Sequence, residues 1–255
     1  LKKLISFKKS KNIEVHINAQ GEPLLYADIL DFIKDTKKIK AVKTISIDTN
    51  GTLLTKKLVD ELAKAGLTRI NLSLNTIDPK TGKIIADNPY NLQKILEIAS
   101  YIPKKLDLII APVWIPGYND EEIPKLIEFS KKIGAGKKYP PIGIQNFLNY
   151  KLGRNPVKQI PMDLFFKKIK DLEKKHNINL TVKNDIKIIE TKEMPKPFKR
   201  KEIIEAEVIL PGRLNKEKLA VTKERLISIP NCYKDGNAKI RITRTKHNIF
   251  FAELV

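Results

Sequence analysis

Hydrophobic and polar positions follow two periods along this chain, and the chain switches regularly between them. Over residues 13–18 apolar and polar side chains alternate as in a β-strand, and over about 25–40 apolar residues recur at helical spacing. The succession continues to about residue 183. It predicts strands at about 13–18, 43–48, 69–74, 106–113, 142–147 and 178–183, and helices at about 25–40, 55–65, 89–101, 120–133 and 162–175, with a short helical turn near 79–86.

The alternation of strands and helices predicts a parallel sheet. Thr55 and Gly66 are suitable caps for the start and end of the second helix. The segment 106–113 is nearly all apolar, as expected of a strand that is covered on both faces. Right-handed βαβ units explain such a pattern, so the fold class is α/β. Periodicity alone leaves both an open doubly wound sheet and a partial barrel possible.

The pattern changes near residue 184. A charged, proline-spaced segment at 192–197 is typical of a linker, and short strands follow from about 201. Five strands in about 55 residues predict a small, all-β, OB-like barrel. We therefore expect a βα domain over 1–185, a linker over 186–200 and a barrel over 201–255. The expected barrel strands are 202–209, 219–221, 225–229, 237–245 and 248–254.

Composition narrows the partners. The net charge is +20, from 49 Lys and Arg against 29 Asp and Glu, so the surface attracts polyanions, and nucleic acid is the favoured one. A lysine-rich thermophile proteome is the alternative, and an anionic membrane surface is less favoured. No apolar run is long enough for a membrane span. The single cysteine, Cys232, allows no internal disulfide, which fits a cytoplasmic protein, and we expect it in a buried or turn position.

Polar residues or glycines stand at the expected carboxyl end of every strand of the βα domain, where parallel sheets carry their chemistry. Glu22 offers a carboxylate for an ammonium group. Hydroxyls and amides such as Ser73 and Asn75 could bind a ribose or a carboxylate, and Gly117 would let a flat ring approach the backbone. Ordinary turn chemistry explains each end taken singly, but their shared pattern is harder to explain in that way.

These strand ends resemble those of the radical S-adenosylmethionine (radical SAM) enzymes. The resemblance spans about residues 10–183 and rests on short motifs in the order of the family, which are Gly-Glu-Pro at 21–23, Thr-Asn-Gly at 49–51, Ser73 with Asn75, and Ile-Pro-Gly-Tyr-Asn-Asp at 115–120. Each motif is weak alone, and the ordered set is more specific. It implies a partial parallel (β/α) barrel that binds SAM at its strand ends.

The resemblance also implies which positions contact SAM. Glu22, with the backbone of its neighbours Gly21 and Pro23, would hold the methionine amino group, because a carboxylate pairs well with an ammonium. Thr49 and Asn50 would lie near the methionine part. Ser73 and Asn75 would face the ribose or the methionine carboxylate. The backbone around Ile115 and Gly117 would contact the adenine, and Asn146 or its neighbour Gln145 would approach the adenine or the substrate.

The other defining motif of the family, CxxxCxxC, holds a [4Fe–4S] cluster through three thiolates, and this chain has one cysteine. The sequence begins just before the second strand of the family's barrel. We expect the cluster loop to lie upstream, because a barrel without its first strand would leave an exposed edge. A protein that lost its cluster and only binds is the alternative. Cleavage of SAM would also require an electron donor for the cluster.

The C-terminal segment resembles a TRAM domain, a small RNA-binding barrel that occurs on several RNA-modifying enzymes. The resemblance is strongest over 239–254 and weaker over 226–231. Residues 199–255 hold 13 Lys and Arg against seven Asp and Glu. By the two-residue period of a strand, Lys239 and Arg241 share one face, while Arg244 and Lys246 fall on the other parity. These four residues are the expected RNA contacts of the barrel.

A few further residues have two explanations. Lys151 and Arg154 follow the last clear strand of the βα domain, where a solvated loop and a phosphate contact are about equally favoured. His16 lies inside the first strand, and a packing role is favoured over a catalytic one. Phe250 and Phe251 could stack on a base, although core packing is favoured.

Together these features predict a radical SAM enzyme that modifies RNA, with tRNA as the favoured substrate. Methylthiolation or another functionalisation of a base carbon fits, because tRNA methylthiotransferases combine the two domains. Two alternatives stay open. One is a non-catalytic RNA-binding protein on a degenerate barrel, and the other is a radical SAM enzyme that acts on a protein or a small molecule.

Overall fold

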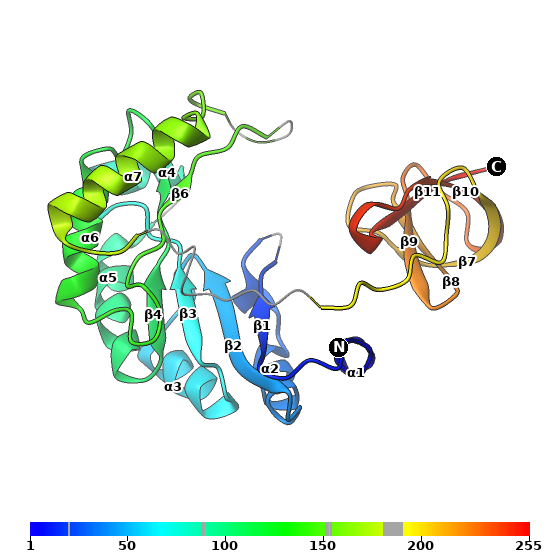
Figure 1. Cartoon of the computed structure of the whole chain (residues 1–255), viewed down its shortest axis with the longest axis horizontal. Helices are drawn as coiled ribbons and strands as arrows, with labels where there is room; N and C mark the ends of the chain where they lie inside the picture. Colours follow the sequence, from blue (N-terminus) through cyan, green and yellow to red (C-terminus); the bar gives the residue numbers. More distant parts are fainter. Residues whose placement is uncertain (20, 88–89, 151–152, 154, 181–190) are drawn as a thin grey trace. The chain divides into compact units, whose positions relative to one another are not determined.

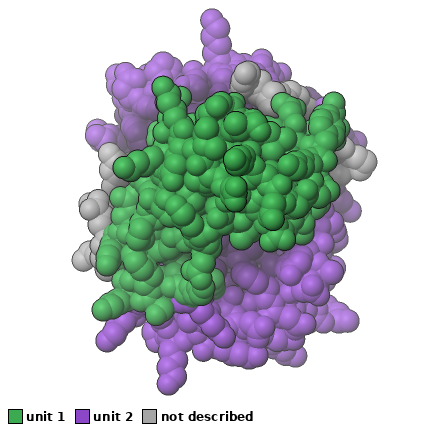
Figure 2. All heavy atoms as spheres, turned by 90° about the vertical axis from the view of Figure 1, so that its right-hand side faces the viewer, with its two compact units in different colours: residues 1, 3–9, 190–255 green, residues 2, 10–189 purple. Residues whose placement is uncertain are grey.

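The chain folds into two compact units in a computed structural model, which describes residues 1–19, 21–87, 90–150, 153, 155–180 and 191–255 (Figure 1). The first unit comprises residues 1, 3–9 and 190–255, and the second comprises residues 2 and 10–189. Figure 2 shows the first unit in green and the second in purple.

The second unit, the βα unit, alternates strands and helices as the sequence predicts. Its strands are β1 (Ile13–Ile17), β2 (Val42–Thr49), β3 (Arg69–Leu72), β4 (Asp107–Ile110), β5 (Val113–Trp114) and β6 (Gln145–Asn146). Its helices are α2 (Ile29–Lys37), α3 (Lys56–Ala65), α4 (Pro79–Ala86), α5 (Leu92–Tyr101), α6 (Glu122–Lys132) and α7 (Met162–His176), with short 3-10 turns at Pro23–Leu25 and Ile102–Lys104.

The strands of this unit are parallel and follow chain order. β1, β2, β3 and β4 form one sheet in that order, and β5 pairs with β6 (Figure 1). A parallel bridge between Ile110 and Ile142 places the segment before β6 beside β4. The segment predicted as one strand at 106–113 is interrupted before β5, since Pro112 has no N–H to donate to a ladder. The strand predicted at 178–183 lies largely outside the described residues.

Local sequence signals explain the ends of the helices. Thr55 accepts a hydrogen bond from the N–H of Leu58 at 3.1 Å, and Gly66 ends α3 with a φ of 110°, so both predicted caps are confirmed. The helix predicted from residue 25 begins later, at Ile29, because Glu22 caps a separate 3-10 turn in front of it.

The two faces of the sheet differ in polarity. Ile45 and Ile47 of β2 are fully buried, and α2 and α3, which pack against one another, supply buried apolar residues such as Ile33 and Leu62. Alternate positions of a strand point to opposite faces. Ser46 and Asp48 of β2 therefore lie on the face away from these isoleucines.

The first unit contains the short helix α1 (Lys2–Lys8) and a closed five-stranded barrel, as the sequence predicts for its C-terminal part. Phe198 packs edge-on against Phe250 with their ring centroids 5.1 Å apart, and Cys232 is buried in the same core. Core packing of Phe250 is thus confirmed. The strands, in barrel order, are β10 (Gly236–Arg244), β11 (Phe250–Leu254), β9 (Arg225–Ile229), β8 (Lys218–Thr222) and β7 (Ile203–Pro211).

Among the described residues, no helix combines the length and the apolar character needed to cross a membrane.

Candidate functional site

Glu22 joins the carboxyl ends of β1 and β2. Its carboxylate accepts hydrogen bonds from the hydroxyl of Thr49 at 2.7 Å, from the N–H of Asn50 at 2.9 Å and from the N–H of Leu24 at 3.1 Å. A carboxylate has about four acceptor positions. Three protein donors therefore fix the orientation of Glu22 and leave it the capacity for one further donor, such as an ammonium group.

The turn after β2 depends on a glycine. Gly51 has a φ of 78°, and a Cβ atom there would lie 2.7 Å from Cδ1 of Leu72 at the end of β3. Glycine is thus required both for the backbone conformation and for the close approach of the two strand ends. Before it, the side-chain oxygen of Asn50 accepts hydrogen bonds from the N–H and the hydroxyl of Thr52 at 2.9 and 2.6 Å.

A cavity of about 290 Å³ opens beside these strand ends, and we call it the carboxyl-end cavity. Three of the residues expected to contact SAM line it, namely Asn50, Ser73 and Asn75. No charged side chain is among its lining residues in the described part of the chain. The rest of the lining comes from the turn after β2, the segment after β3, α4 and the segment before α5, and comprises Thr52, Thr76, Gly82, Ile85, Ala86 and Tyr90.

Asn119 organises the loop that follows β5. Its amide N–H groups donate to the carbonyls of Asn75 and Val113, both at 2.9 Å, and its side-chain oxygen accepts from the N–H of Ile115 at 2.7 Å. The side-chain oxygen of Asn75 in turn accepts from the N–H of Val113 at 2.8 Å. Asn119 is 1% exposed. Asn119 belongs to the Ile-Pro-Gly-Tyr-Asn-Asp motif at 115–120, but the motif alone does not predict these contacts.

The loop residues Ile115 and Gly117 do not line the carboxyl-end cavity. Asp120 holds this loop, because its carboxylate accepts hydrogen bonds from the N–H of Gly117 and, at 2.9 Å, from the indole of Trp114. The N–H groups of Ile115 and Gly117 are both engaged within the loop. If the adenine lies against this segment, it meets backbone carbonyls and side chains rather than free amides.

Asn146 of β6 also lies away from the cavity. Its amide donates to the carbonyl of Ile160 at 2.7 Å and to the sulfur of Met162 at 3.3 Å. Its side-chain oxygen is buried and has no hydrogen-bond partner within the described residues. A buried acceptor without a partner costs stability, so this oxygen suits a ligand that donates an N–H group. The predicted phosphate contacts Lys151 and Arg154 lie outside the described residues.

Glu122 binds, through hydrogen bonds, the segment before α4 that carries Thr76. Its buried carboxylate accepts from the hydroxyl of Thr76 at 2.7 Å, from the N–H of Ile77 at 2.9 Å and from Lys125 at 2.7 Å. Burial raises the pKa of Glu122, but the hydrogen bonds from Lys125, Thr76 and Ile77 outweigh it, so the pKa lies below its ordinary value.

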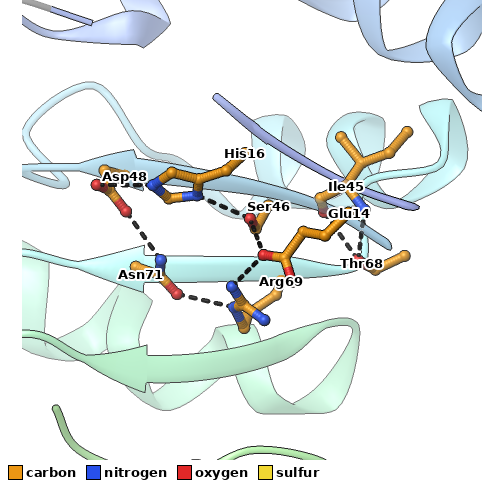
Figure 3. Close-up of polar contacts among 8 residues, drawn as sticks. All are labelled: Glu14, His16, Ile45, Ser46, Asp48, Thr68, Arg69 and Asn71. Atoms are coloured by element: carbon orange, nitrogen blue, oxygen red, sulfur yellow. Dashed lines mark hydrogen bonds and ion pairs between the residues drawn. The ribbon is translucent and has the colours of Figure 1, made fainter. Parts of the chain in front are cut away.

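Six polar side chains of β1, β2 and β3 form a closed ring of hydrogen bonds, drawn in Figure 3. We call it the polar ring, and it consists of Glu14, His16, Ser46, Asp48, Asn71 and Arg69. Ser46 donates to Glu14 at 2.7 Å, His16 lies 2.8 Å from Ser46 and 3.2 Å from Asp48, and Asn71 donates to Asp48 at 2.8 Å. Arg69 closes the ring by donating to Asn71 at 2.9 Å and to Glu14.

The polar ring corrects the expected packing role of His16. The imidazole is 40% exposed, and both of its nitrogens contact polar groups of β2. The single-strand pattern missed this role, because the partners of His16 lie about 30 residues further along the chain. The guanidinium of Arg69, another member of the polar ring, lies over the ring of Tyr139, with its central carbon 4.1 Å from the ring centre.

A second cavity, of about 280 Å³, lies at the amino ends of β2, β3 and β4, and we call it the lysine cavity. The carboxylate of Asp107 in its wall accepts three backbone hydrogen bonds, and Lys105 pairs with Asp60 at 3.1 Å. Three further lysines line this cavity and come from separate segments, namely Lys43, Lys137 and Lys138. None of the three has an ion-pair partner in the described part of the chain.

The barrel presents basic side chains along β10. Lys239 is exposed, whereas Arg241 pairs across the strands with Glu253 at 2.9 Å. The pairing of β10 with β11 is irregular between Ile242 and Arg244, which is typical of a β-bulge. Beyond it Arg244 is exposed and lies 5.4 Å from the ring centre of the half-buried Phe251. Lys246 is exposed in the turn that follows.

Comparison with known proteins agrees with the parallel α/β fold of the βα unit. The profile of the Radical SAM superfamily matches residues 1–130. This chain belongs to the Radical SAM superfamily. An uncharacterized protein of Methanocaldococcus jannaschii, MJ0103, is 39% identical over the whole chain, which spans 65% of that protein. The GTP 3′,8-cyclase of Aquifex aeolicus is 32% identical over 47% of this chain and 37% of its own length.

A solved structure supports the fold. The structure of Streptococcus suis SuiB bound to S-adenosylmethionine matches 65% of this chain and 38% of its own chain, with a TM-score of 0.53 and 22% identity. The radical SAM type of α/β fold is therefore confirmed for the βα unit. This chain spans less than two thirds of the length of each of these relatives.

Members of the superfamily bind SAM and a [4Fe–4S] cluster, and the residues present fit the first of these. The carboxyl-end cavity has uncharged polar groups, Glu22 has one free acceptor position beside it, and Asn146 has an unpartnered oxygen. The cluster finds no ligand set in these residues. Cys232 is the single cysteine of the chain and lies in the barrel core, and the described residues contain no other metal-binding group of side chains.

Proposed function

We infer that this chain is part of a radical SAM enzyme that modifies RNA, with a tRNA base as the substrate and methylthiolation or another functionalisation of carbon as the reaction. The observation that carries the proposal is the union of two features in one chain. A cavity lined by uncharged polar groups lies at the strand ends of the βα unit, and a closed five-stranded barrel with a basic strand follows it in the chain.

The residues of the cavity have distinct tasks in this proposal. When bound, SAM together with a [4Fe–4S] cluster held by residues outside this chain would supply radical chemistry for the substrate. Glu22 accepts the methionine ammonium, in an orientation fixed by Thr49 and the N–H of Asn50. Ser73 and the amide of Asn75 bind the ribose or the carboxylate. An electron donor must reduce the cluster.

Two basic regions would hold the RNA. In the barrel, which we propose to be a TRAM domain, Lys239 and Lys246 contact phosphates, and Arg244 with Phe251 offers a flat surface for a base. In the βα unit, the lysine cavity would bind a backbone phosphate. The GTP 3′,8-cyclases, whose substrate is a nucleotide, support a substrate that contains a nucleobase.

The test uses the protein with its natural upstream residues, reconstituted with iron and sulfide without oxygen. With a reductant and SAM it should form 5′-deoxyadenosine, and total tRNA from a strain that lacks the gene should raise the amount formed. Absence of both the cluster and SAM cleavage would overturn the enzyme proposal and favour a non-catalytic RNA-binding protein.

The choice of substrate class has its own test. Cross-linking in cells should recover RNA with the protein, and tRNA from the deletion strain should lack one modified nucleoside. SAM cleavage together with an unchanged set of tRNA nucleosides would favour the alternative of a protein or small-molecule substrate.

A further inference from the structure

The polar ring is firmly anchored on one side and accessible on the other. Its buried side consists of Ser46, which is fully buried, and Arg69, whose side chain is 4% exposed. On the open side, the side chains of Asp48 and His16 are 35% and 40% exposed. A ring that served only to hold the strands together would not need to leave its two most polar members in reach of a ligand.

The open side of the polar ring leads toward the carboxyl-end cavity. Asp48 of β2 lies two residues before Asn50, and Asn71 of β3 lies two residues before Ser73, and both Asn50 and Ser73 line the carboxyl-end cavity. Residues two apart along a strand point to the same side of the sheet. A ligand beside Asp48 would therefore lie along the same polar strip as a ligand in the cavity.

Hydrogen-bond directions around the ring follow from Arg69, which can only donate. Because it donates to the oxygen of Asn71, the amide of Asn71 donates to Asp48. Ser46 uses its one proton on Glu14, so His16 Nδ1 must donate to Ser46, and His16 Nε2 must donate to Asp48.

This arrangement defines what the open side offers. Both nitrogens of His16 are engaged, and the imidazole is 40% exposed, so it offers a planar ring on which an aromatic ring can stack. Asp48 uses two of its about four acceptor positions, on Asn71 and His16, and keeps two for a ligand. Because the polar ring contains two carboxylates beside Arg69 and His16, it has no excess positive charge to attract a phosphate.

From this geometry we propose that His16 and Asp48 form a binding site for a nucleobase, in which the base stacks on the imidazole and donates N–H groups to the carboxylate. The proposal rests on the proposed function and deepens it, because it separates base recognition from phosphate binding. The base lies at the polar ring, next to the cofactor cavity, whereas the phosphates lie on lysines elsewhere.

The test observes His16 directly by NMR in the 255-residue chain, which contains three histidines, His16, His176 and His247. The probes are the four nucleoside 5′-monophosphates, and ribose 5-phosphate is the control that has the sugar and the phosphate without a base. At least one nucleotide should shift the His16 ring resonance in a saturable way, whereas ribose 5-phosphate should leave it in place.

Two substitutions of Asp48 test the carboxylate. Asp48→Asn should weaken the nucleotide response of His16 about tenfold, the usual cost of losing a charge-assisted hydrogen bond. Asp48→Glu, which displaces the carboxylate by one methylene, should weaken it as well and serves if the first variant fails to fold. Asp35→Asn is the matched control, because it removes an exposed carboxylate of α2 that lies outside the polar ring, and it should keep the response.

Three results would overturn the proposal: no shift of His16 with any nucleotide, an equal shift with ribose 5-phosphate, or an unchanged response in both Asp48 variants. The readout needs neither the cluster nor SAM cleavage. Its failure is therefore distinct from failure of the proposed function, which is measured by 5′-deoxyadenosine and by tRNA nucleosides.

Discussion

The two ends of the parallel sheet carry cavities of nearly equal size and opposite character. The carboxyl-end cavity, of about 290 Å³, is lined by uncharged groups such as Ser73 and Asn75, whereas the lysine cavity, of about 280 Å³, has three unpaired lysines. Volume therefore does not separate them, but charge does. Both cavities adjoin β2 and β3, so the difference arises from the residues at and beyond the two ends of these strands.

This difference assigns different ligands to the two ends. SAM carries a sulfonium and an ammonium, so unpaired lysines would repel it, whereas neutral amides and the carboxylate of Glu22 suit it. A phosphate has the reverse preference. With the proposed ligands, one α/β unit keeps a cationic cofactor and an anionic partner apart by placing them at opposite ends of its strands.

Filling one cavity at a time should give the largest difference in activity between the two ends. Ser73→Trp places a large ring in the carboxyl-end cavity and should lower 5′-deoxyadenosine formation by the upstream-extended protein about 100-fold, through lost positioning of SAM. Thr44→Trp, the matched change in the lysine cavity, should leave this rate near that of the unmodified protein. Equal losses in both variants would contradict separate roles for the two ends.

Acid should loosen the carboxyl end in particular. The pKa of Glu122 is lowered in the folded protein, so its carboxylate stabilises the fold above its ordinary value of 4.5, and this contribution is lost as the pH falls through the lowered pKa. Glu122→Gln should reduce the free energy of unfolding at pH 7 by about 2 kcal/mol, measured by urea denaturation. The difference from the unmodified protein should shrink below pH 4.5, and a constant difference would contradict this role.

Removing the unpaired lysines should affect the other end. The triple variant Lys43→Ala, Lys137→Ala and Lys138→Ala should weaken tRNA binding about tenfold at 0.1 M salt and flatten its salt dependence, because fewer counterions are released. The control removes three exposed lysines of α7, Lys167, Lys170 and Lys174. If both variants lose the same affinity, then total charge rather than the lysine cavity binds the RNA.

The smallest effect is expected on the barrel. Arg244→Ala should weaken tRNA binding about threefold and reduce the preference for single-stranded RNA, because the base loses the guanidinium that covers Phe251. Arg241→Ala is the matched control, since Glu253 already neutralises that side chain. A larger loss with Arg241→Ala would contradict this assignment.

Much of the fold could be predicted from local signals. Thr55 and Gly66 end their helix as expected, because capping depends on neighbouring residues alone. The strand ends at Glu22 and Asn50 could also be located, because polar residues there interrupt clear apolar periods. The order of these ends in space then follows from the chain order of a parallel sheet.

The parts that could not be predicted depend on contacts between distant segments. His16 was predicted to be a packing residue, because the sequence does not show which residues of β2 the strand register places beside it. The bulge before Arg244 cannot be inferred from a two-residue period that it interrupts. The lysine cavity joins Lys43 to Lys137 across more than 90 residues, so no local pattern could show that these charges converge.

The central claim is that this protein uses SAM to modify an RNA base. The most direct measurement compares tRNA nucleosides by mass spectrometry in a strain that lacks the gene, after complementation with the unmodified gene or with Ser73→Trp. The account predicts that one modified nucleoside is missing from the deletion strain, returns with the unmodified gene and stays missing with Ser73→Trp. Identical nucleosides in all the strains would contradict it.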